Sequence, residues 1–162
     1  MLFLRKFLDD IPHRPEFAFR DDRMLILEVA VRHPKISVYN SVALLHRTHN
    51  NDRLQATSGL KQSVQNYQHL NIYKHILDAL EQNDELTARR KAAAIKVLWP
   101  LAHWISKDYL ADAEKLVEWI YHLDPNFKIP ERGLLGFLYN KLGFKRTEKL
   151  LSSRRSVKKL FK

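Results

Sequence analysis

LKQSVQNYQHLNIYKHILDALEQ, residues 60–82, decides the fold class of this chain of 162 residues. Its apolar residues recur at mixed spacings of three and four, which is the pattern of a helix with a buried face. These residues are Leu60, Val64, Tyr67, Leu70, Ile72, Tyr73, Ile76, Leu77 and Leu80. Glycine is scarce in the chain, at four residues, and proline modest, at six, a composition that suits helices. We therefore predict one long helix over 60–82.

The helical pattern continues from this stretch to the C-terminus. We predict a helix over 85–106, with a kink or break at Pro100. A third covers 109–123, with Asp108 as its N-cap and the Asp124–Pro125 pair ending it. A short helix over 131–142 stops at Gly143, and residues 145–161 form a basic amphipathic helix.

The N-terminal residues carry a different pattern. Residues 21–33 predict a helix that ends before Pro34, and residues 35–45 are rich in β-branched side chains, which favours a strand. The predicted fold class is mainly α: a small α/β N-terminal segment, with a helix plus one or two strands, precedes a helical C-terminal region. We place the domains at 1–55, 56–143 and 144–162, the last being a basic amphipathic tail.

Composition and charge exclude several classes of protein. The chain has no cysteine, so disulfides and thiolate sites are excluded. Its net charge is +10, and residues 126–162 alone hold eleven Lys/Arg against two Asp/Glu, a balance of +9. No apolar run approaches the ~18–20 residues of a membrane-spanning helix, and the opening apolar stretch is too short for a signal peptide. We expect a cytoplasmic protein, and peripheral attachment to the inner membrane surface stays open.

Three stretches of the N-terminal third carry a resemblance to a known family. They are LFLRKFLDDI at 2–11, the Asp21–Asp22 pair followed by an apolar helix, and VYNSVALLHRTHNND at 38–52. In this order they resemble the C-terminal part of the catalytic domain of a family 2 (GT-A type) glycosyltransferase. The resemblance covers about a third of the chain, and the helical region beyond it looks like extensions that some of these enzymes carry.

The resemblance implies a role for each of four residues. Asp22 would be the general base that deprotonates the acceptor hydroxyl, and Asp21 its acidic neighbour. Arg47 would face a phosphate of the nucleotide-sugar donor, and His49 would be a ligand of a divalent cation, Mn²⁺ or Mg²⁺.

The chain also departs from that family. His46 stands where an aromatic residue is usual, and Glu28 stands where a basic residue is common. The Asp-x-Asp motif and the donor-binding half are missing from the sequence. We therefore expect a truncated domain that is inactive alone, and that holds the cation only if a donor-binding domain completes it.

Plainer interpretations stay open beside this one. An Asp pair at a helix start usually complements the helix dipole, and histidines in a polar loop are usually solvated. The chain would then be a non-enzymatic helical interaction module. Its tail could lie on an anionic membrane surface or simply be solvated. Nucleic acid is a disfavoured partner, because basic and aromatic residues do not interleave on a predicted folded surface. Homo-oligomer formation is a further alternative.

Overall fold

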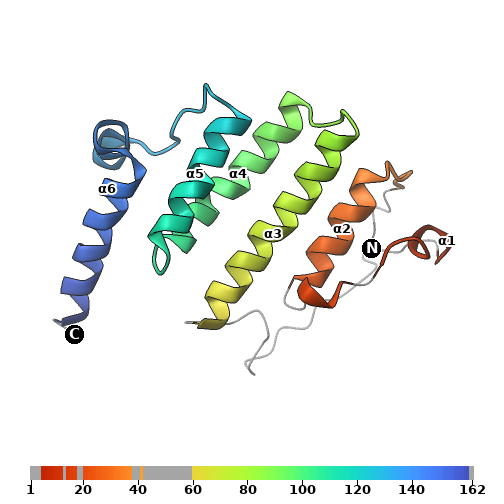
Figure 1. Ribbon diagram of the computed structural model, residues 1–162, viewed down its shortest axis with the longest axis horizontal. Helices are drawn as coiled ribbons and strands as arrows, with labels where there is room; N and C mark the ends of the chain where they lie inside the picture. Colours follow the sequence, from red (N-terminus) through yellow and green to blue (C-terminus); the bar gives the residue numbers. More distant parts are fainter. Residues whose placement is uncertain (1–4, 13, 18–19, 38–40, 42–59, 161–162) are drawn as a thin grey trace. The chain divides into compact units, whose positions relative to one another are not determined.

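The computed structural model describes residues 5–12, 14–17, 20–37, 41 and 60–160. The chain divides into two compact units, Met1–Gln82 and Asn83–Lys162. This division falls at neither of the predicted domain boundaries, because the long helix over 60–82 belongs to the N-terminal unit. The described part is mainly helical, as predicted (Figure 1). None of its helices is both long enough and apolar enough to cross a bilayer.

In the N-terminal unit, α2 (Asp21–Val31) packs against α3 (Leu60–Gln82), and both contact the 3₁₀ turn η1 (Pro15–Phe17). The short helix α1 (Arg5–Leu8) precedes them (Figure 1). The bounds of α3 are those that its apolar spacing predicted. Met24 and Val29 of α2 and Ile76 of α3 are among the buried apolar side chains of this unit.

The predicted N-terminal strands are not seen among the described residues. Residues 5–8 are helical, and residues 33–37 have no regular structure. Ile36 is 80% exposed there, although a strand would need a partner to satisfy its backbone and cover its apolar face. The rest of the predicted strand over 35–45 lies outside the described residues, apart from Ser41. The small α/β segment is therefore corrected to helices and irregular structure as far as the chain is described.

In the C-terminal unit, α4 (Ala88–Ile105) and α5 (Leu110–Leu123) form an antiparallel hairpin (Figure 1). Thr87 caps α4 by accepting a hydrogen bond from the Arg90 amide at 3.4 Å. We predicted a kink or a break at Pro100; the helix continues through this residue, so it does not break there. The N-cap of α5 is Tyr109 rather than Asp108, and Asp124 ends the helix as predicted.

The last helix, α6 (Gly133–Leu160), packs against α5 and changes direction at Gly143 (Figure 1). Gly143 has φ +76° and ψ 171°, a conformation that L side chains rarely adopt. The prediction that Gly143 separates two helical stretches is confirmed. Phe144, Thr147 and Glu148, just beyond it, are buried, so the first turns of the predicted tail belong to the core of this unit.

Candidate functional sites

A cleft of about 380 Å³ opens beside α2 in the N-terminal unit. It lies between one face of α2 and the segment that joins α1 to η1. Its lining combines apolar side chains with three carboxylates and one guanidinium: Ile11, Pro12, Arg14, Asp21, Asp22, Met24, Leu25 and Glu28. The cleft therefore brings both predicted catalytic carboxylates to a cavity of ligand size.

Asp21 and Asp22 also have a local structural role. The Asp22 amide donates to Asp21 Oδ1 at 2.7 Å, and the Arg23 amide donates to Asp22 Oδ1 at 2.7 Å. The first N–H groups of a helix lack intrahelical partners, and carboxylates there also complement the helix dipole. Both side chains are exposed. Their geometry is that of residues that stabilise a helix start.

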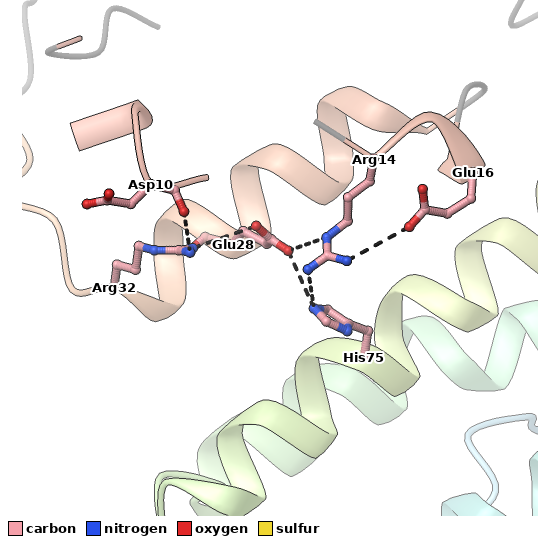
Figure 2. A network of polar contacts seen from close by, with 6 residues as sticks. All are labelled: Asp10, Arg14, Glu16, Glu28, Arg32 and His75. Carbon is pink, nitrogen blue, oxygen red and sulfur yellow. Dashed lines mark hydrogen bonds and ion pairs between the residues drawn. The ribbon is translucent and has the colours of Figure 1, made fainter. Parts of the chain in front are cut away.

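Glu28, at the other end of the cleft-lining face of α2, is only 4% exposed. Figure 2 shows the basic side chains that surround it, Arg14, Arg32 and His75. Arg14 Nε donates to Glu28 Oε1 at 2.7 Å, His75 Nε2 lies 3.4 Å from the same oxygen, and Arg32 Nη1 lies 3.7 Å from Oε2. The Arg32 guanidinium also donates to the main-chain oxygens of Glu28 and Asp10.

This network compensates a buried carboxylate, which would otherwise be strongly destabilising. It connects α2, α3 and the segment before η1 through polar side chains. The glycosyltransferase resemblance leads us to expect a basic residue at position 28. In this chain the acidic residue there is explained by the basic side chains that bind it.

The remaining predicted site residues, Arg47 and His49, lie outside the described residues, as does His46. Within the described ranges, no group of three or more His, Asp or Glu side chains is arranged to hold a metal ion. Asp21 and Asp22 by themselves do not make the oxygen-rich shell that Mn²⁺ or Mg²⁺ requires. The predicted cation site thus stays a prediction.

The sequence provided no signal for a buried polar cluster in the C-terminal unit. Glu148 is 2% exposed and accepts hydrogen bonds from His103 Nδ1 at 2.6 Å, Tyr139 Oη at 2.5 Å and Ser106 Oγ at 2.8 Å. Burial raises the pKa of this carboxyl, but the bonds from His103, Tyr139 and Ser106 and the charge of His103 outweigh it, lowering the pKa from 4.5 to about 2. Glu148 is thus an ionised carboxylate in the core.

A second carboxylate, Glu131, lies on the other side of His103. Its Oε1 accepts a hydrogen bond from Trp99 Nε1 at 2.8 Å and lies 3.5 Å from His103 Nε2. Trp99 is 3% exposed, and its ring contacts those of His103, Tyr139 and Phe144. The two acidic residues of the last 37 positions are therefore both directed inward, toward α4.

The outer surface of α6 carries the opposite charge. Beyond Gly143 the buried positions Phe144, Thr147 and Glu148 occupy one face of the helix. Between Gly143 and Ser153, the exposed side chains on the rest of the helix surface are Lys145, Arg146, Lys149, Leu150 and Ser153. Lys145 pairs with Glu114 of α5 at 2.7 Å, whereas Arg146 and Lys149 form no ion pair within the described part of the chain.

His69 is a buried histidine of α3 and a third titratable feature. Burial, and then the charges of Arg23 and Arg20, lower its pKa from 6.5 to about 4, so the ring is neutral at pH 7. The ring lies 5.3 Å from that of Tyr73. A neutral, buried ring of this kind acts as a core side chain.

No protein-family model matches this chain, and neither the curated proteins nor the solved structures contain a match. Function is therefore inferred from charge, burial and packing.

Proposed function

We propose that the protein is a non-enzymatic helical interaction module that binds an anionic partner through the outer surface of α6. The observation that carries this proposal is the inward direction of Glu131 and Glu148. Trp99, His103, Tyr139 and Ser106 bind these carboxylates. The exposed cations of the same segment, up to Ser153, are Lys128, Arg132, Lys141, Lys145, Arg146 and Lys149.

The charge arrangement strengthens the electrostatic attraction beyond what the net charge suggests. Residues 126–162 have eleven Lys/Arg and two Asp/Glu, so the sequence balance is 11 − 2 = +9. Glu148 is 2% exposed and is hydrogen-bonded to His103, Tyr139 and Ser106, so its carboxylate is not presented at the surface. A surface that concentrates one sign of charge attracts and steers partners of the opposite sign.

Binding of the full chain to heparin, a soluble polyanion, tests this proposal. We expect affinity to fall steeply with salt, because charges are screened over about 10 Å at 0.1 M. The variant Arg146→Glu/Lys149→Glu lowers the net charge from +10 to +6, since each reversal removes two charges. It should bind heparin at least about tenfold more weakly at low salt.

Lys35→Glu/Lys74→Glu is the matched control. Both lysines are exposed in the N-terminal unit, and the double reversal changes the net charge by the same amount. The control should retain most of the heparin affinity. An equal loss in both variants would mean that only net charge matters and that α6 is not the binding surface.

A second candidate function is the acceptor-side part of a family 2 glycosyltransferase, with a nucleotide sugar as donor. The observation that favours it is the position of Asp21 and Asp22 in the cleft beside Arg14. A carboxylate that lines a cavity can act as general base when the acceptor hydroxyl lies within hydrogen-bond reach. The divalent cation, Arg47 and His49 belong to this second proposal.

Asp22→Asn discriminates between the two candidate functions. If Asp22 only stabilises the start of α2, the substitution lowers the free energy of unfolding by about 0.5 kcal/mol, measured by far-UV circular dichroism. If Asp22 is a base, turnover in the presence of a donor-binding domain falls by about 10²–10⁴-fold. Asp21→Asn is the control, and it should change stability more than turnover. For Asp22→Asn we expect only the small stability effect, and for the chain itself no transfer activity.

A further inference from the structure

We infer that the anionic partner of α6 is a lipid bilayer surface. This inference rests on the proposed function and adds a separate observation, the exposure of large apolar side chains on both helical stretches of α6, before and after Gly143. Leu134 is 75% exposed, Phe137 57% and Leu150 54%. An exposed cationic surface alone would bind any polyanion. The identity of the partner is therefore inferred from these apolar side chains.

Leu134 and Phe137 are three residues apart, so they are neighbours on the helix surface before Gly143. Leu150, beyond Gly143, adjoins the exposed Lys149 and is four residues from Arg146. Helices that lie in the bilayer interface combine cations with leucine and phenylalanine. Their cations contact anionic headgroups, and their apolar side chains enter the acyl boundary.

The packing of α6 keeps these side chains exposed. The position of an added Gly136 Cβ would lie 2.2 Å from the main-chain oxygen of Glu131, so the first turns of α6 approach the preceding segment closely. Tyr139, on the buried side of the same helix, donates to Glu148. With this side held in the core, Leu134 and Phe137 cannot turn inward without breaking those contacts.

Other anionic partners fit the apolar side chains less well. Proteins that bind nucleic acids without sequence preference use phosphate contacts together with aromatic rings on which bases stack. Phe137 could serve as such a ring, but the exposed Leu134 and Leu150 contribute to neither interaction. A bilayer surface uses both the cations and the aliphatic side chains, so its recognition accounts for both kinds of exposed side chain described above.

Co-sedimentation of the full chain with vesicles tests the inference. We expect binding to phosphatidylcholine vesicles that contain phosphatidylserine, and little binding to phosphatidylcholine alone. Leu134→Ser/Phe137→Ser keeps the charge and should weaken vesicle binding about tenfold or more, while heparin binding stays unchanged. Ile36→Ser, which alters an 80% exposed aliphatic residue of the N-terminal unit, is the control and should bind vesicles normally.

The outcomes distinguish the lipid inference from the more general proposal of an anionic partner. Heparin binding that depends on Arg146 and Lys149, without binding to anionic vesicles, overturns the lipid inference and leaves the proposed function intact. If the wild-type chain binds neither heparin nor anionic vesicles, both the lipid inference and the proposed function are contradicted. Binding to single-stranded RNA that exceeds binding to anionic vesicles would overturn the lipid inference and make nucleic acid the partner.

Discussion

Glu148→Ala should lower the free energy of unfolding of the C-terminal unit by about 3–5 kcal/mol, the range for removing one partner of a buried charged pair. Three donors, from His103, Ser106 and Tyr139, would lose their common acceptor. Leaving buried polar groups without partners costs more than the bonds themselves contribute. The loss would weaken the packing of α6 on α4, because Glu148 of α6 binds both His103 of α4 and Ser106, which ends that helix.

Tryptophan fluorescence during denaturant unfolding of the full chain measures this effect selectively. All three tryptophans, Trp99, Trp104 and Trp119, belong to the C-terminal unit. Lys149→Ala, one residue away and exposed, is the control and should change the stability by less than about 0.5 kcal/mol. A Glu148→Ala variant as stable as this control would show that the cluster contributes nothing to the fold.

The same residue predicts a pH dependence with a definite sign. The pKa of Glu148 is lowered by folding from 4.5 to about 2, so the folded state favours the ionised form. Its contribution is complete above pH 4.5 and is lost as the pH falls toward 2, amounting to about 3 kcal/mol. Glu148→Gln removes this titration, so the stability difference between it and the wild-type protein should shrink on acidification through this window.

Gly136→Ala is the second substitution with a large expected effect. The added methyl group would lie 2.2 Å from the Glu131 main-chain oxygen and 2.9 Å from its carbon. Because these are backbone atoms, no side-chain rotation relieves the clash, and the first turn of α6 must shift. We expect a loss of about 3 kcal/mol in the free energy of unfolding, at the upper end for overpacking.

Tryptophan fluorescence again measures this loss, since Trp99 binds the Glu131 side chain. Leu134→Ala, in the same turn but 75% exposed, is the control and should be nearly neutral. Glu131→Gln should not rescue Gly136→Ala, because the clash involves the main chain. A neutral Gly136→Ala would mean that the close approach of α6 to residue 131 is not required.

The sequence revealed those site residues whose contacts are local, and it missed the role of those whose partners lie far away in the chain. The Asp21–Asp22 pair was visible as an acidic helix start, and its contacts are confined to neighbouring amides. Whether either carboxylate also acts on a substrate stays a prediction. Glu28 was noticed only as a departure from a family pattern. Its role emerged from Arg14 and His75, which lie 14 and 47 positions away in sequence.

By itself the sequence determined the helical class, the bounds of α3, the ends of α5 at Asp124 and of the first half of α6 at Gly143, and the basic C-terminal segment. These features depend on apolar spacing, helix-breaking residues and composition, which act over a few neighbouring positions. The predicted strand at 35–45 failed over residues 35–37, because β propensity needs a partner strand and none is present among the described residues.

Only the tertiary structure decided which charged residues are surface and which are core. Glu148 lies in a strongly basic segment and has no periodic signal, yet it is bound by His103 and Ser106, 45 and 42 positions earlier. Such pairing depends on how α4 and α6 pack, since burial makes an unpaired carboxylate costly and a paired one tolerable. The same packing leaves the outer side of α6 with cations and exposed leucines.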